Sequence, residues 1–382
     1  MFPPTTEAGS PEEGAVSDAR GEVDGATPAD ASPDSGPSVP ALRFVGRRDE
    51  TDPQQPKFGW SGSRIIARFN GTEANVTFEE TPLFTPQPNP TYWDVIVDGA
   101  RTNAIALDPG VKTYSVATGL APGVHTIELY KRTEGRVGIT QLRGFAFPGG
   151  ALLAPAPAPS RRIEFFSDST STGYGVECTS STETFTSATQ NERRGYAGLV
   201  AQELGADHHN VSISGKGIFW NLNRGEADVA KDVFVRTLQG GAADWVFTRF
   251  VPDVVWMMLG SNDYDTGNPP GPPAYDDVKN AYVALVALVR SKYPAAHIFL
   301  ATAPNLNDDY PVGYAARTNV RNASAAAVAA RAAAGDTKVY AYDFTRSDYP
   351  GDQTGCGFHV NLAKSRSMAD EAKAQIRAKT GW

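Results

Sequence analysis

The pattern of apolar residues changes once along this chain of 382 residues, near residue 150, and the change predicts two domains of different class. From residue 41 to about residue 150, short alternating segments are separated by Gly, Pro or Asn, and no helical period interrupts them. Seven or eight such segments at regular spacing predict a β-sandwich of the jelly-roll kind over residues 41–150. The expected strands are ALRFVGR, SRIIARF, ANVTFEE, WDVIVDG, KTYSVATG, GVHTIELYKR and LRGFAF.

A different pattern follows a stretch rich in Pro and Ala, residues 151–160, which predicts a semi-rigid linker. Over residues 161–382, apolar β-type runs alternate with helical patterns, which predicts a doubly wound, mostly parallel sheet covered by helices. The expected strands are RRIEFF, HHNVSIS, VPDVVWMML, HIFLATA and VYAYDF. The expected helices are YAGLVAQELG, DDVKNAYVALVALVRSKY, NVRNASAAAVAARAAA and SRSMADEAKAQIRAKTG. No apolar run is long enough to predict a membrane-spanning helix.

Residues 1–40 carry most of the formal net charge of −8, since they hold eight acidic residues against the single base Arg20. Their Pro, Ala, Ser and Gly content predicts a disordered tether, because so few apolar side chains cannot offset the cost of ordering. The nearly neutral remainder gives no electrostatic reason to expect nucleic acid as a partner. The first residues, MFPPTTEAG, show neither a basic region nor an apolar region of a secretory signal. The tether and the two cysteines nevertheless lead us to expect a bacterial protein that is secreted or tethered to the cell surface.

In a doubly wound sheet, functional residues lie in the loops that follow the carboxyl ends of the strands. Ser169 follows the first expected strand, and Gly215 and Asn262 follow the second and third. A serine hydroxyl can act as a nucleophile if a base and an anion-stabilising pocket are near. A glycine N–H and an asparagine amide can donate to such an anion. Taken alone, each of these three residues more often marks an ordinary turn, and an isolated SDS tripeptide most often forms a turn that caps a helix.

A base for this serine is expected in the loop before the last helix, at His359. The chain has five histidines. His125 belongs to the expected β-sandwich, and His208, His209 and His297 stand at or just before strand starts, at the opposite end of the sheet. Only His359 has the position that lets it lean back over the sheet toward the serine.

The order Ser, Gly, Asn, His resembles the SGNH (GDSL-like) hydrolase superfamily, and residues 42 to 380 resemble carbohydrate esterase family 2, the acetyl xylan esterases and their relatives. In the first domain the resemblance rests on RFVGR, FNGT, VDG and especially GVHTIELYKRTEG; in the second it rests on RRIEFFSDSTSTGYGVEC, SGKGIFWN, DWVFTRFVPDVVWMMLGSND and GCGFHVN. The resemblance implies that Ser169 is the nucleophile and His359 the base. It further implies an oxyanion hole formed by the Ser169 N–H, the Gly215 N–H and the Asn262 side chain.

The chain departs from the family pattern where a carboxylate should orient the histidine. The family often has Asp two residues before the histidine, where this chain has Gly357, and the superfamily position one residue earlier is Cys356. We therefore expect a Ser–His dyad whose imidazole is held by the Cys356 or Gly357 backbone carbonyl. Asp352 is the nearest acid in the loop, and the remoter candidates are Asp263, Asp343 and Asp348. A smaller departure is Ser167, which stands where the family usually has glycine.

The two cysteines, Cys178 and Cys356, stand nine residues after Ser169 and three before His359. If the two segments meet at one site, their sulfurs are neighbours and a disulfide is expected; two free buried thiols are the alternative.

These observations predict a serine esterase that removes O-acetyl groups from plant polysaccharide, either xylan or gluco- or mannan, through an acyl-enzyme. No metal or other cofactor is expected, because no cluster of residues has ligand spacing. The partner is an acetylated polysaccharide or oligosaccharide, and we expect a monomer. A carbohydrate-binding protein with little or no activity, and an esterase acting on lipid, aryl or thioester substrates, are the alternatives.

Four aromatic residues near the expected site could face a sugar ring, or else pack in the core or rim. They are Tyr174, Trp220, Tyr264 and Phe358.

Overall fold

The computed structural model describes residues 41–83, 89–266, 270–348 and 351–382. The predicted tether, residues 1–40, lies outside the described residues. Within the described part of the chain, no helix has both the length and the apolar character needed to cross a membrane.

The first part of the structure, which we call the β-domain, consists of eleven strands in the described residues between Arg43 and Leu153. They form two antiparallel sheets, with the orders β1-β4-β9-β6-β7 (β11 also pairs with β4) and β2-β3-β10-β5-β8. Buried and half-exposed residues alternate along β5, as expected for a sheet with one face on a core. The strands are β1 (Arg43–Val45), β2 (Arg48–Asp49), β3 (Lys57–Phe58), β4 (Arg64–Asn70), β5 (Ala74–Pro82), β6 (Tyr92–Val97), β7 (Ala100–Ala106), β8 (Gly110–Ala117), β9 (Val124–Lys131), β10 (Gly138–Ala146) and β11 (Ala151–Leu153).

The two sheets enclose one apolar core between them. Phe58 and Phe78 come from one sheet, and Trp93 and Leu129 come from the other. The Phe78 and Trp93 rings stack with their centroids 5.3 Å apart. Each side chain of this size contributes about 1.5–3 kcal/mol when fully buried, so this core holds the sheets face to face.

The predicted linker, residues 151–160, begins later than expected because Ala151–Leu153 form β11. This short strand pairs antiparallel with β4, so that Ala151 lies opposite Asn70. The pairing stops just before the proline-rich residues that follow, since proline has no N–H to donate to a neighbouring strand.

The second part, which we call the α/β-domain, contains a five-stranded parallel sheet with the order β13-β12-β14-β15-β16. All five predicted strands are present. The second strand is shorter than expected and ends at Asn210. The N–H of the next residue, Val211, still donates to the Phe165 carbonyl of the first strand. The strands are β12 (Arg162–Ser167), β13 (Asp207–Asn210), β14 (Val254–Met258), β15 (His297–Thr302) and β16 (Val339–Asp343).

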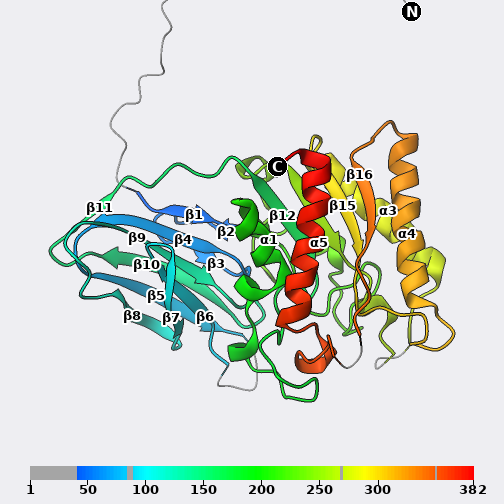
Figure 1. The fold of residues 1–382 in the computed structure, drawn as a ribbon, viewed down its shortest axis with the longest axis horizontal. Coiled ribbons are helices and arrows are strands. Elements are labelled where there is room, and N and C mark those ends of the chain that lie inside the picture. Colours follow the sequence, from blue (N-terminus) through cyan, green and yellow to red (C-terminus); the bar gives the residue numbers. More distant parts are fainter. Residues whose placement is uncertain (1–40, 84–88, 267–269, 349–350) are drawn as a thin grey trace, which may run out of the picture. The chain divides into compact units, whose positions relative to one another are not determined.

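Helices connect these strands, and the four predicted helices are present. The strand order reverses after β13, so right-handed crossovers place α1 on the opposite face of the sheet from α3 and α4. Helix α5 runs beside α1, and α3 packs against α4 (Figure 1). The helices are α1 (Tyr196–Leu204), α2 (Ala230–Phe234), α3 (Tyr275–Lys292), α4 (Ala316–Ala333) and α5 (Leu362–Thr380), with 3-10 turns η1 (Ser187–Thr189), η2 (Glu192–Arg194), η3 (Phe247–Arg249), η4 (Asn262–Tyr264) and η5 (Cys356–Phe358). The sequence pattern did not predict α2, which is too short to show a helical period.

Buried polar contacts join the two domains. Arg47 of the β-domain donates to both carboxylate oxygens of Glu164 on β12, at 3.0 and 3.1 Å, and both side chains are fully buried. The Trp60 indole of the β-domain packs into the apolar core of the α/β-domain and donates to the Thr237 carbonyl at 2.8 Å. Removing one partner of a buried ion pair leaves an uncompensated charge, so these contacts hold the domains in one arrangement.

Candidate active site

A single cavity of about 510 Å³ brings together the four residues selected from the sequence. Ser169, Gly215 and Asn262 line it from the loops that follow β12, β13 and β14, and His359 lines it from the loop before α5. The cavity lies at the carboxyl ends of the strands, where a sheet that reverses its strand order opens a crevice.

Ser169 is held in a tight turn directly after β12. The Ser169 carbonyl accepts hydrogen bonds from the Tyr174 N–H at 3.1 Å and from the Thr172 hydroxyl at 2.9 Å. Ser167, which replaces the usual glycine, ends the strand and donates its hydroxyl to the Met258 carbonyl at 2.5 Å. The turn therefore accommodates this serine, and Ser169 remains at the cavity wall with 9% of its surface exposed.

His359 completes a hydrogen-bonded pair with Ser169. Its Nε2 lies 2.7 Å from Ser169 Oγ, and its Nδ1 lies 2.8 Å from the Cys356 carbonyl oxygen. A carbonyl only accepts, so Nδ1 carries the proton and Nε2 presents its lone pair to the serine hydroxyl. Burial lowers the pKa of His359 below its ordinary value, and its hydrogen bond to Cys356 opposes that shift. The imidazole is therefore neutral at pH 7, as a general base must be.

A backbone carbonyl holds the imidazole where many hydrolases use a carboxylate. Three of the four acidic candidates make other contacts. Asp352 accepts from the Asp348 N–H, and Asp343 pairs with Arg317. Asp263 accepts the backbone N–H groups of Ile218, Phe219 and Trp220, at 2.8–2.9 Å.

The predicted disulfide joins Cys178 to Cys356, whose Cα atoms are 5.5 Å apart. It links the segment after the nucleophile turn to the turn that carries the carbonyl beside His359. Gly175, at φ +56°, lies against this turn, and a Cβ there would approach the Cys356 Cβ within 2.6 Å. This approach requires glycine, so the GYG sequence after Ser169 has a packing role as well as a turn role.

Gly215 and Asn262, two of the three predicted donors of the oxyanion hole, have different surroundings. Gly215 adopts φ +83°, and among the described residues no group accepts a hydrogen bond from its N–H. Asn262 Nδ2 donates to the Lys216 carbonyl at 2.9 Å and makes a longer contact, 3.3 Å, with the Asp168 carboxylate. Burial raises the pKa of Asp168 to about 7, and the nearby Asp263 adds to the shift.

Two of the four aromatic residues selected from the sequence line the cavity, namely Tyr174 and Tyr264. Trp220 and Phe358 do not line it. The Arg224 guanidinium lies over the Trp220 ring, with its central carbon 5.3 Å from the ring centroid. Phe358 is 46% exposed. Helical or strand periodicity does not specify on which side of a loop an aromatic ring lies.

The cavity wall includes residues that sequence reasoning missed. Phe185 stacks on Tyr174 with ring centroids 3.9 Å apart, and Tyr310 is 61% exposed at the rim. Glu134 and Arg136 reach the wall from the turn between β9 and β10 of the β-domain. For Glu134 the sequence signal is the KRTEG segment, residues 131–135, which is part of the family resemblance; Arg136 directly follows it. Within the described ranges, no three His, Cys, Asp or Glu side chains gather as metal ligands would.

Both parts of the chain match known protein families. Residues 44–157 match the family described as Carbohydrate esterase 2 N-terminal. Residues 165–363, just over half of the 382 residues, match the GDSL-like Lipase/Acylhydrolase family.

Named relatives agree with these matches. The chain is 35% identical over 352 residues to the cellulase/esterase CelE of Acetivibrio thermocellus; this covers 90% of the chain but only 40% of that longer protein. It is 26% identical over 354 residues to an acetylxylan esterase / glucomannan deacetylase of Cellvibrio japonicus, covering 90% of each. A solved family two carbohydrate esterase from Clostridium thermocellum, in complex with cellohexaose, superposes with a TM-score of 0.81 at 33% identity, covering 90% of this chain and all of the other.

Proposed function

The chain belongs to carbohydrate esterase family 2, with a GDSL-like hydrolase domain, and from this premise we propose that it is a serine esterase that removes O-acetyl groups from plant polysaccharide. One relative is named an acetylxylan esterase / glucomannan deacetylase, and another was solved with cellohexaose. We extend these names to a substrate class, acetylated xylan, glucomannan or mannan.

The observation that carries the proposal is the geometry of Ser169 and His359. A hydroxyl 2.7 Å from a neutral imidazole nitrogen, at the wall of an open cavity, is the arrangement that nucleophilic acyl transfer requires. The 2.8 Å contact from Nδ1 to the Cys356 carbonyl fixes the ring and the tautomer. Both nitrogens of His359 are thus assigned, one to holding the ring and one to moving the proton.

The reaction proceeds in two steps. His359 Nε2 takes the proton of Ser169 Oγ while that oxygen attacks the acetyl carbonyl, and the resulting imidazolium then protonates the departing sugar oxygen. In the second step the same nitrogen takes a proton from water as that water attacks the acetyl-serine, and the imidazolium returns the proton to Ser169 Oγ as acetate is released. In both steps the N–H groups of Ser169 and Gly215 and the amide of Asn262 would donate to the carbonyl oxygen as it becomes negative.

We propose a catalytic dyad rather than a triad. The Cys356 carbonyl sets the tautomer of His359 but lacks the negative charge with which a carboxylate stabilises imidazolium. Gly357 leaves that place open: a Cβ built on it would lie 3.7 Å from His359 Nδ1, and apart from the neighbouring residues in the chain no other described atom would lie within 4 Å. The Asp that the family often places there would stand beside the imidazole.

Several finer features belong to the same proposal. The strand connectivity of the β-domain fits a jelly roll, and tyrosines at the cavity wall and rim, such as Tyr174 and Tyr310, suit a sugar ring. The disulfide suits an oxidising compartment, so we propose a secreted or surface-tethered bacterial protein. A monomer suffices, because one chain supplies every residue invoked above.

The test of this function is a substrate panel. We expect the purified protein to release acetate from a soluble acetyl ester and from acetylated xylan or glucomannan. Equal or faster hydrolysis of long-chain acyl esters would favour a lipid esterase instead. Retention on the polysaccharide without acetate release from any acetyl ester would favour a carbohydrate-binding protein.

The pH dependence follows from the buried imidazole. Because burial lowers the pKa of His359, kcat/KM should fall on acidification with a midpoint below the ordinary value of about 6.5. The unfolded chain binds this proton more readily than the folded chain does, so acidification through this range also lowers the free energy of unfolding. A profile of kcat/KM between pH 4.5 and 8 on a soluble acetyl ester measures the midpoint.

Asp168 provides the competing explanation for such a profile, since burial raises its pKa to about 7. A midpoint near 7 that disappears in Asp168→Asn would assign the acidic limb to Asp168. A midpoint below 6.5 that survives this substitution assigns it to His359.

A further inference from the structure

The β-domain holds the main chain of the loop that carries Gly215. Arg136, in the turn between β9 and β10, donates from Nη1 to the Ser214 carbonyl at 2.8 Å. Glu134, two residues earlier, accepts the Ser214 N–H at 2.8 Å and also the Ser214 hydroxyl. Both polar backbone groups of Ser214 are therefore bound by side chains from the other domain.

The contact to the Ser214 carbonyl determines where the Gly215 N–H points. The Ser214 C=O and the Gly215 N–H belong to one peptide unit, which is planar and trans, so the two groups point in opposite directions. With the carbonyl held toward Arg136, the N–H is turned away from that guanidinium. Gly215 lines the cavity beside Ser169, and none of the described residues accepts its N–H.

A cation on the carbonyl has a second effect on the same peptide. A hydrogen bond from guanidinium polarises the C=O, and this polarisation makes the N–H of that peptide unit a stronger donor. Loss of the Arg136 guanidinium would therefore change both the orientation of the Gly215 N–H and its strength as a donor.

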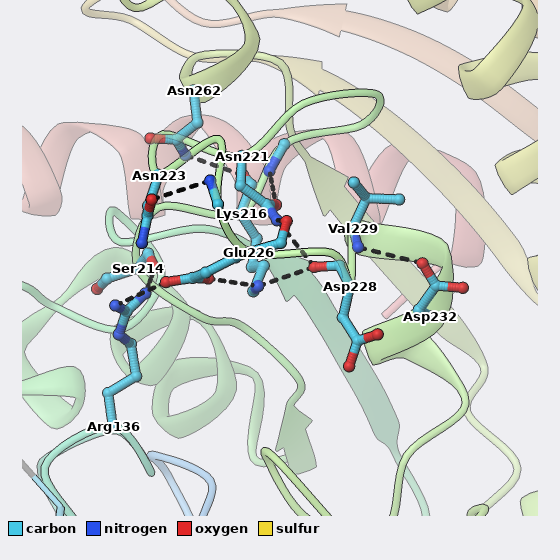
Figure 2. A network of polar contacts seen from close by, with 12 residues as sticks. Arg136, Ser214, Lys216, Asn221, Asn223, Glu226, Asp228, Val229, Asp232 and Asn262 are labelled. Atoms are coloured by element: carbon cyan, nitrogen blue, oxygen red, sulfur yellow. Dashed lines mark hydrogen bonds and ion pairs between the residues drawn. The ribbon is translucent and has the colours of Figure 1, made fainter. Parts of the chain in front are cut away.

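The same network continues to Asn262, another proposed donor of the oxyanion hole. Arg136 Nη2 pairs with Glu226 at 3.1 Å, and the other carboxylate oxygen of Glu226 accepts from Lys216 Nζ at 2.7 Å. The Lys216 carbonyl in turn accepts from Asn262 Nδ2 at 2.9 Å. Figure 2 shows Arg136 extending to Ser214 and Glu226 from one side of this loop, with Asn262 on its far side.

We propose that Arg136 is a positioning residue of the β-domain that aims and polarises the Gly215 N–H for the oxyanion of the acyl-transfer reaction. The inference rests on the proposed esterase function. It gives the β-domain a part in the chemical step that does not depend on glycan binding.

Arg136→Met tests the proposal, because methionine keeps most of the apolar stem and removes the donors and the charge. On a soluble acetyl ester, which has no polysaccharide to bind, we expect kcat to fall about 10- to 100-fold, somewhat less than the loss of a whole oxyanion donor, with KM nearly unchanged. The rate at which diethyl 4-nitrophenyl phosphate modifies Ser169 should fall by a similar factor, since its phosphoryl oxygen would occupy the same hole. The concentration of active sites is found by letting this reagent react to completion, and each rate is divided by that concentration. Unfolded protein then does not affect the comparison.

Arg143→Met is the matched control. Arg143 on β10 pairs with Glu79, and its side chain is 36% exposed, against 38% for Arg136, but it does not line the cavity. Arg136→Lys should recover part of the lost kcat, because a lysine ammonium can donate to the same carbonyl. An unchanged kcat in Arg136→Met, an equal loss in Arg143→Met, or no recovery with lysine overturns the inference while leaving the esterase function in place. If the wild-type protein hydrolyses no acetyl ester, the proposed function falls first and this inference falls with it.

Discussion

Replacing Ser169 by alanine is expected to lower kcat on acetyl esters by about 10⁴- to 10⁶-fold, the largest effect of any single substitution in this chain. The reason is that Ser169 Oγ is the atom that would form the new bond to the acetyl carbon, and it faces His359 Nε2 at 2.7 Å. The fold should tolerate the change, since the turn is held by the Ser169 backbone carbonyl and not by its hydroxyl. Acetate release under saturating substrate, with a thermal melt of the same sample, measures both effects.

Ser171→Ala is the matched control, two residues along the same turn. The Ser171 hydroxyl is fully buried and bonds to the Tyr196 hydroxyl at 2.6 Å, so its loss should cost stability rather than activity. If Ser169→Ala retained more than about a hundredth of the wild-type kcat, another nucleophile would have to be sought.

Replacing His359 by alanine is expected to lower kcat/KM by about 10⁴-fold or more at neutral pH, because His359 Nε2, 2.7 Å from Ser169 Oγ, is the base that would take the serine proton. The residual rate should rise with hydroxide concentration above pH 8, since solvent base then replaces the imidazole. The kcat/KM of the variant between pH 6 and 10 provides the measurement.

His297→Ala is the control for this substitution. His297 begins β15 at the opposite end of the sheet and bonds to the Tyr340 hydroxyl at 3.0 Å, so we expect its kcat/KM to stay near that of the wild type. Comparable losses in both histidine variants would point to a general loss of folded protein instead.

The two largest expected effects concern Ser169 and His359, which the sequence pattern alone indicates. The reason is that strand periodicity and chain order are local properties of a sequence. Once five strands of the second domain are placed in a parallel sheet, their carboxyl ends share one edge, and Ser169, Gly215 and Asn262 follow three of them. His359 could be selected because the other four histidines fall in the β-domain or at strand starts.

Residues outside these loops could not be assigned in the same way. The Arg136 side chain meets Ser214 across 78 positions of the sequence, and the contact depends on how the β9–β10 turn docks on the α/β-domain. For Tyr174, Trp220, Tyr264 and Phe358 the sequence left open whether each ring faces the cavity or packs elsewhere, and of these four Tyr174 and Tyr264 line the cavity. A loop has no fixed period that relates residue number to the side on which a ring lies.

By itself, then, the sequence determined the class of both domains, the strand ends that gather the chemistry, and the absence of a carboxylate two and three positions before His359. The tertiary structure decided that the Cys356 carbonyl rather than Asp352 holds the imidazole, and that the β-domain reaches the loop of Gly215 through Glu134 and Arg136. The physical reason is that hydrophobic period and turn chemistry act between near neighbours in the chain. The partner of a polar group depends instead on which surfaces the folded core brings within about 3 Å of each other.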